Sequence, residues 1–254
     1  GALLATMTAA PTGKGQLRTL PNRAFSTGER LTFDISYGII TAGQATMSIP
    51  AYRTIADRQT LETRIEAASS SSFDWVFKVR DRYETFLDAQ GIFPWRFEQH
   101  VREGHYSKDY NAVFDPLSRT AVASDGRTYS TSAYVHDIVS AFYYIRTLDL
   151  SHSHRGDVFR LENFYDGQTH PLEVRVLGHQ KVESDAGTFE CCVIEPMVVA
   201  GGLFKSEGSI KIWVTDDENH MPVRMASKIL IGEIVASLVR YEGVRNPLTS
   251  KFAN

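Results

Sequence analysis

The segment from Ile212 to Met225, IWVTDDENHMPVRM, places three consecutive acidic residues and a histidine between two apolar runs. Carboxylate oxygens and an imidazole nitrogen are groups that hold metal ions and transfer protons. Asp216, Asp217 and His220 are therefore the strongest candidates for chemistry in the sequence, either as a metal site or as the acid–base groups of a hydrolase. The competing interpretation is the turn of a hairpin.

The residues on both sides of this acidic turn, residues 216–220, favour the hairpin. Apolar side chains occupy every second position around it, namely Ile210, Ile212 and Val214 before it and Met221, Val223 and Met225 after it. Asp and Asn are preferred in turns because their side chains bond nearby backbone amides. The ligand spacing and central glycine of an EF-hand calcium loop are absent from this segment. We expect an exposed turn, with the metal or enzyme site as the alternative.

Other motifs that carry chemistry are missing or incomplete. The sequence has no G-x-S-x-G nucleophile motif and no glycine-rich phosphate loop. His100 and His105 enclose VREG, which does not match the spacing of metalloprotease helices. His152 and His154 are a start on a zinc site, but the sequence does not identify a third ligand. The sequence therefore predicts no catalytic residue, no cofactor and no enzymatic activity.

Aromatic residues gather in two neighbouring segments and indicate a binding function instead. If the chain is extended from Phe73 to Val79, the side chains of Phe73, Trp75 and Phe77 share one face. Such a face is commonly part of a hydrophobic core, but in a barrel it can also line a cavity for a lipid-like ligand. The candidate ligand-binding residues are Trp75, Phe77, Trp95, Phe142 and Trp213.

Alternating apolar residues predict that β-strands position these side chains. The stretch ERLTFDISY places Leu31, Phe33 and Ile35 on one face, and Asp166-Gly167 marks a later hairpin turn. In HDIVSAFYYIRTLDL the apolar residues recur at helical spacing behind Asp137, a suitable N-cap. We predict a mainly β fold, with about a dozen strands in one long antiparallel sheet that curls on itself, and one amphipathic helix near residues 137–149.

The domain boundaries follow from where the alternation starts and stops. Residues 1–24 are predicted to form a flexible N-terminal tail, 25–245 a single β-barrel-like domain, and 246–254 a C-terminal tail. Within the domain, Cys191 and Cys192 are adjacent. Because neighbouring side chains on a strand point to opposite faces, we expect one thiol in the core and one outside it.

Composition limits the classes of function. The chain has 254 residues, of which 43% are hydrophobic and 22% are charged, with a formal net charge of -3. These values are typical of a globular protein, and the dispersed basic residues predict no nucleic-acid partner. No apolar run approaches the roughly 18 residues of a membrane-spanning helix. The first residues lack the basic start and long apolar stretch of an intact signal peptide, and are consistent with what remains after processing.

Four stretches of the sequence form a recognisable set when taken in order. They are GERLTFDISYGIITAGQATM, VRDRYETFLD, HDIVSAFYYIR and IKIWVTDDENHMPVRMASKILIGEIVASLVRYEG. This set resembles the bacterial family called domain of unknown function 3108, over nearly everything from Phe25 to Tyr241. The resemblance implies an exported protein of Gram-negative bacteria, in the periplasm or associated with the outer membrane, with a sheet wound into a spiral or incomplete barrel. It implies no catalytic residues, because the family has no established reaction.

One principal hypothesis follows from these observations. The protein is expected to be a non-catalytic envelope protein that binds a lipid-like small molecule or another envelope protein. The alternatives are a hydrolase or metal-dependent enzyme that uses the acidic turn, and a purely structural protein of the cell envelope.

Overall fold

The computed structural model describes residues 16–198, 210–228 and 232–253 of the chain. This part contains one helix, α1 (Ile138–Ile145), and strands β1 (Arg30–Tyr37), β2 (Ile40–Ile55), β3 (Arg58–Ser69), β4 (Arg80–Asp88), β5 (Pro94–Glu103), β6 (Tyr106–Asp115), β7 (Thr120–Ala123), β8 (Thr128–Ser130), β9 (Val158–Tyr165), β10 (Gln168–Ser184), β11 (Gly187–Val198), β12 (Ile210–Thr215), β13 (Pro222–Lys228) and β14 (Glu233–Glu242).

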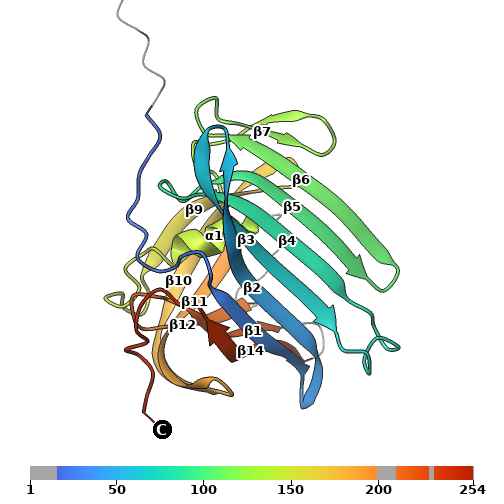
Figure 1. The fold of residues 1–254 in the computed structure, drawn as a ribbon, viewed down its shortest axis with the longest axis vertical. Coiled ribbons are helices and arrows are strands. Elements are labelled where there is room, and N and C mark those ends of the chain that lie inside the picture. The colour runs from blue at the N-terminus through green and yellow to red at the C-terminus, as the bar shows by residue number, and fades with distance from the viewer. Residues whose placement is uncertain (1–15, 199–209, 229–231, 254) are drawn as a thin grey trace, which may run out of the picture.

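All 14 strands belong to one antiparallel sheet, in the order β8-β7-β6-β5-β4-β3-β2-β1-β14-β13-β12-β11-β10-β9. Strands that follow each other in the chain are neighbours in the sheet, except β8 and β9, which form its two edges. At the centre of the sheet, two strands far apart in the chain are neighbours. There β1 pairs with β14 and joins the start of the domain to its end. The sheet curls around α1 as an incomplete barrel (Figure 1). This arrangement confirms the predicted fold class.

The two halves of the sheet meet through side chains instead of a closing ladder. Lys108 of β6 donates a hydrogen bond of 3.2 Å to the hydroxyl of Tyr165 in β9. The rings of Phe114 and Phe164 from the same two strands lie edge to face, with centroids 5.8 Å apart. Because no backbone ladder joins the edge strands β8 and β9, the sheet stays open.

Helix α1 fills one end of the space inside the sheet. Its predicted N-cap is confirmed: the carboxylate of Asp137 accepts hydrogen bonds from two amides of the first turn and from Thr85 Oγ1 of β4. The helix ends at Ile145, whereas the prediction extended it to residue 149. Ala141 and Tyr143 are buried in addition to Val139 and Ile145. Its apolar face is therefore wider than an amphipathic stripe. No helix among the described residues is long and apolar enough to cross a bilayer.

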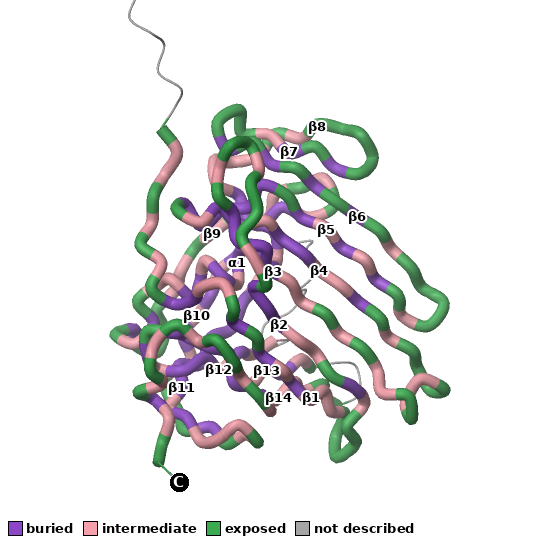
Figure 2. The backbone as a smooth tube through the Cα atoms, in the orientation of Figure 1, coloured by how far each residue is buried: buried purple, intermediate pink, exposed green. Residues whose placement is uncertain are grey.

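The space inside the sheet is tightly packed at one end of β4 and less tightly packed further along the strand. The face of β4 turned toward α1 carries Leu87, Thr85, Tyr83 and Asp81, because alternate residues share a face. Leu87 and Thr85 are fully buried beside the helix, whereas Tyr83 is half-buried. Burial is concentrated around α1, and the hairpin tips far from it are exposed (Figure 2). The molecule thus has a packed end and an open end.

Two expectations about local structure need correction. Residues 71–76 form a hydrogen-bonded turn, so Phe73 and Phe77 do not lie on an extended strand. Cys191 and Cys192 are both fully buried, in different core clusters. Both faces of β11 are covered because the tip of the β10–β11 hairpin reaches β14, where Ala186 N donates to the Leu238 carbonyl at 3.3 Å.

Candidate functional site

The acidic turn between β12 and β13 is a turn, as predicted, but most of it is not exposed. Asp217, Asn219 and His220 are buried, with exposed fractions of 6%, 0% and 7%. Only Glu218 is exposed, and Asp216 is half-buried. The expectation of an exposed, solubilising turn is therefore wrong for three of its five residues.

Asp217 is buried because neighbouring groups satisfy both of its carboxylate oxygens. Oδ1 accepts hydrogen bonds from Thr215 Oγ1 at 2.9 Å and from the Asn219 backbone amide at 3.0 Å. Oδ2 accepts from Ser250 Oγ at 2.6 Å. Asn246 of the same C-terminal segment donates its backbone amide to Asn219 Oδ1 at 2.9 Å. The acidic turn is thus the anchor for residues 246–250, which the sequence assigned to a tail.

His220 and Asn219 connect the turn to the end of α1. His220 Nδ1 donates to the carbonyl of Arg146 at 2.7 Å, and burial lowers the pKa of this imidazole. The fully buried guanidinium of Arg146 donates to the Asn219 carbonyl at 3.0 Å and makes a two-pronged ion pair with Glu29. It also lies 5.1 Å from the ring centroid of Phe25. We call Glu29, Arg146, Asp217, Asn219 and His220 the buried polar network.

The buried polar network joins three separate parts of the chain but offers little to a substrate. Its donors and acceptors are directed at one another, and the groups are closed off from solvent. No cluster of His, Cys, Asp or Glu among the described residues has an arrangement that could hold a metal ion. The network therefore has the features of a structural anchor, in keeping with the need to pair buried charges.

The five aromatic candidates lie in different places. Trp75 is 85% exposed at a hairpin tip, whereas Trp95 is buried and donates Nε1 to Asp88 at 3.0 Å. Phe142 is half-buried and packs against both core clusters. Phe77 alone lines the apolar pocket described next, and Trp213 lies in a separate groove. The structure does not bring these residues together in one site.

An apolar pocket opens at the end of the curled sheet that α1 leaves unfilled. Its volume is about 490 Å³. The strand ends contribute Ile35, Ala67 and Ile234, and the connection between β3 and β4 contributes Phe73 and Phe77. This volume falls within the roughly 300–1,000 Å³ of typical small-molecule sites. We call it the mouth pocket.

Two carboxyl groups stand in the wall of the mouth pocket. Asp81 and Glu103 come from the adjacent ends of β4 and β5, and Asp81 Oδ1 accepts a hydrogen bond of 2.8 Å from the amide of Arg102. Burial, the charge of Asp81 and a hydrogen bond between the two side chains raise the pKa of Glu103. No Lys, Arg or His is among the residues that line this pocket in the described part of the chain.

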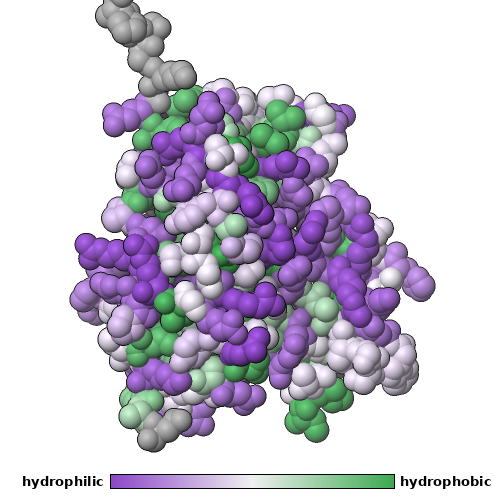
Figure 3. Space-filling model, in the orientation of Figure 1, coloured by the Kyte–Doolittle hydropathy of each residue, from purple (hydrophilic) through white to green (hydrophobic). Residues whose placement is uncertain are grey.

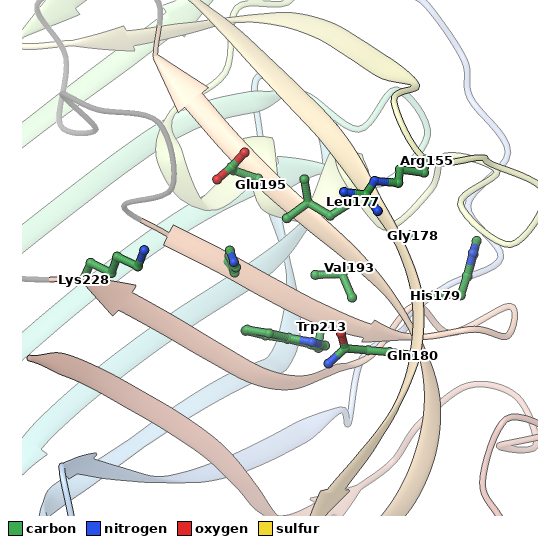
Figure 4. A pocket seen from close by; sticks show the side chains of 10 residues that line it. Arg155, Leu177, Gly178, His179, Gln180, Val193, Glu195, Trp213 and Lys228 are labelled. Carbon is green, nitrogen blue, oxygen red and sulfur yellow. The ribbon is translucent and has the colours of Figure 1, made fainter.

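A second hollow of about 480 Å³ lies on the other face of β10–β13, opposite the helix. Trp213 stands beside Gln180 in this groove (Figure 4). Arg155, Lys211 and Lys228 make its lining polar and basic. Charged walls suit a lipophilic molecule poorly, because a buried charge without a partner is costly.

Sequence reasoning missed the mouth pocket and the acid pair. The period of two places Asp81 on the inner face of its strand, which was a usable signal because an acid on an apolar face is unusual. The sequence pattern does not indicate that Asp81 lies beside Glu103, because this contact depends on the register of β4 with β5.

A comparison with known families identifies the family of this chain. Residues 32–239 match the model of the family described as "Protein of unknown function (DUF3108)". The chain belongs to this family. Arg146 and Asp217 of the buried polar network lie within the matched range. The family description names no activity, and no curated protein matches the sequence.

Solved structures show a similar fold at low sequence identity. A β-barrel-like protein of domain of unknown function DUF1849 from Brucella abortus is 12% identical, with a TM-score of 0.53 over 86% of this chain and 98% of that one. A chain from Parabacteroides distasonis, described as a candidate lipoprotein, is 10% identical over 89% of this chain and 99% of that one, with a TM-score of 0.38. Of these two, the Brucella structure is similar enough to support a shared fold.

Proposed function

We propose that this DUF3108 protein is a non-catalytic protein of the bacterial envelope that binds a lipophilic molecule in the mouth pocket. The observation that carries the proposal is the apolar pocket itself, which lies where the helix leaves the sheet unfilled. Ile35, Ala67 and Ile234 supply walls without hydrogen-bonding groups. An apolar molecule gains free energy by leaving water for such walls. The family resemblance supports the envelope location.

The acid pair limits which lipophilic molecules fit. Asp81 and Glu103 are the acidic residues of the pocket lining, and the described part of the chain contributes no basic side chain to it. A ligand carboxylate would meet like charge there, whereas a hydroxyl or an ammonium group could donate hydrogen bonds to the pair. We therefore expect the ligand to have an alkyl chain or a ring system and a neutral or cationic polar end.

The alternative of an enzyme that uses the acidic turn finds less support. Asp217 and His220 already have partners within the buried polar network, and Ser250 covers one oxygen of Asp217. A hydrolase needs its acid and base within reach of a substrate. The mouth pocket is the better candidate for a functional site because it offers an open space of about 490 Å³, whereas the groups of the acidic turn are enclosed by their partners.

Binding of the neutral fluorescent probe N-phenylnaphthylamine tests the proposal. Ala67→Trp should fill the pocket and weaken binding by at least about tenfold, the equivalent of about 1.4 kcal/mol. Val113→Trp, on the exposed outer face of β6, is the matched control and should bind as the wild type does. In competition, a long-chain alcohol should displace the probe better than the fatty acid of equal length.

Native mass spectrometry of protein taken from its own bacterial envelope supplies a second measurement, because a retained lipid-like mass would identify the ligand. The proposal would be abandoned if the wild type does not bind the probe, or if Ala67→Trp binds it unchanged. A stoichiometric metal in the same sample would instead favour the enzyme.

A further inference from the structure

Large apolar side chains are exposed mainly at one end of the molecule. Eight of the thirteen large hydrophobic residues that are exposed in the described part of the chain lie at the strand ends around the mouth pocket. We call this group the apolar rim: Tyr37, Ile39, Ile40, Trp75, Val76, Phe77, Tyr106 and Ile234. The other five lie away from the mouth pocket, and three of them belong to β6, β7 and their connection.

The topology explains why these residues lie together. In a meander, every second connection lies at the same end of the sheet, so the β1–β2, β3–β4 and β5–β6 connections are neighbours (Figure 1). Backbone hydrogen bonds join them: the Ser70 amide donates to the Ala42 carbonyl at 2.9 Å, and the Gly104 amide donates to the Lys78 carbonyl at 2.8 Å. The three connections that carry most of the apolar rim are therefore held side by side.

We propose that the apolar rim docks this protein on the surface of a lipid bilayer, with the mouth pocket facing the lipid. The choice of a bilayer as the partner rests in part on the proposed function. Phe77, Tyr37 and Ile234 belong both to the rim and to the pocket lining. A lipophilic ligand could thus pass between the bilayer and the pocket without crossing water.

The side-chain types of the apolar rim suit insertion at a membrane interface. Ile39 is fully exposed at the tip of the β1–β2 hairpin, and Trp75 is 85% exposed at the next tip. Tryptophan and tyrosine favour the headgroup level of bilayers because their rings are apolar with one polar group. The tip of the β1–β2 hairpin is visibly apolar at the bottom of the molecule (Figure 3).

The charges near the apolar rim also fit a lipid surface. No charged residue occurs between Asp34 and Arg53, so the β1–β2 hairpin enters lipid without burying a charge. In the β3–β4 connection, Asp74 is paired with Arg80 at 2.7 Å, and the ammonium group of the exposed Lys78 could approach anionic headgroups. A docking site for another protein would not require an uncharged apolar tip with a basic residue in the neighbouring connection.

Vesicle co-sedimentation of the whole chain tests the proposal, with phosphatidylcholine vesicles and with mixtures of phosphatidylcholine and phosphatidylglycerol. The wild type should bind both, and the mixture more tightly. The double variant Ile39→Asp with Ile40→Asp should lower partitioning by at least about tenfold, about 1.4 kcal/mol. Leu117→Asp is the matched control, because Leu117 is 51% exposed, close to the 55% of Ile40, in the β6–β7 connection at the opposite end. It should bind as the wild type does.

Tryptophan fluorescence then separates insertion from adsorption. Emission should shift to the blue on vesicle addition, and brominated lipids should quench it in the wild type but much less in Trp75→Phe. The proposal is overturned if the wild type binds neither vesicle type, or if the rim variant binds the vesicles as tightly as the wild type does. It is also overturned if the rim change abolishes self-association instead, which would make the rim a contact between two copies.

The two proposals can fail separately. The rim variant should keep its affinity for N-phenylnaphthylamine, because Ile39 and Ile40 do not line the mouth pocket. Ala67→Trp should lose the probe and still bind vesicles. Loss of vesicle binding alone therefore counts against docking, and loss of probe binding alone counts against the proposed ligand site.

Discussion

Arg146 and Glu29 are 117 residues apart in the sequence, yet two hydrogen bonds of 2.7 and 2.8 Å join their side chains inside the protein. Burial disfavours the charged guanidinium, but the charge of Glu29 and its hydrogen bonds keep the pKa of Arg146 above its ordinary value. The pair links the entry of β1 to the end of α1. It thereby fixes the helix inside the sheet.

Removing only one member of this pair should be costly. Glu29→Leu leaves the guanidinium buried without its counter-charge, and we expect unfolding free energy to fall by about 3–5 kcal/mol in urea titrations. The double variant Glu29→Leu with Arg146→Met should lose less than the two single changes added together. Glu242→Gln, in the exposed pair with Arg240, should change stability by less than about 1 kcal/mol. Additive single effects would contradict the pairing.

The acidic turn should respond to mutation as a structural anchor. Asp217→Ala removes the acceptor of Thr215, Asn219 and Ser250, and should lower the unfolding free energy by at least about 2 kcal/mol. Limited proteolysis should then cleave near Ser250 more readily. The exposed neighbour Glu218 supplies the control, because Glu218→Ala should change neither property. A metal ion that is lost with Asp217 would show that the enzyme hypothesis was right.

Stability should fall on mild acidification because of His136. Burial lowers the pKa of this imidazole to about 3, whereas an unfolded histidine titrates near 6.5. Between these values the unfolded chain binds a proton that the folded chain does not, so unfolding free energy falls with a slope approaching about 1.4 kcal/mol per pH unit. His220, also lowered, acts in the same direction.

Urea titrations across this pH range measure how the unfolding free energy depends on pH. In His136→Phe this dependence should correspond to nearly one fewer proton taken up on unfolding. Asp137 contributes with the opposite sign: burial raises its pKa, so its contribution is present at low pH and is lost as the pH rises through that raised value. An unaltered slope in His136→Phe would mean that His136 protonates in the folded state.

The two thiols should be inert in the folded protein. Burial raises the pKa of Cys192 to about 11 and raises that of Cys191 further above its ordinary value. Only thiolates react readily with disulfide reagents such as dithionitrobenzoate. We expect reaction at the rate of unfolding, and prompt reaction of both thiols in denaturant. Rapid modification of the native protein would show that β11 is more accessible than its packing indicates.

The alternation of apolar residues was enough to predict strands, one antiparallel sheet and the helix capped by Asp137. These features depend on local periodicity and on side-chain bonds to nearby amides. The same periodicity placed Phe73 and Trp75 on an imagined strand, although the chain there forms a hydrogen-bonded turn. Composition alone did not distinguish these two outcomes, because aromatic residues occur in both settings.

The sequence by itself therefore determined the kinds of elements and their order. Tertiary structure decided which acids became buried and where a pocket opened. Asp217 is buried because Ser250 reaches it from a distant segment, and Glu103 faces Asp81 because of strand register. Such contacts are set by how the whole sheet curls, since burying a polar group is tolerable only where distant partners satisfy it.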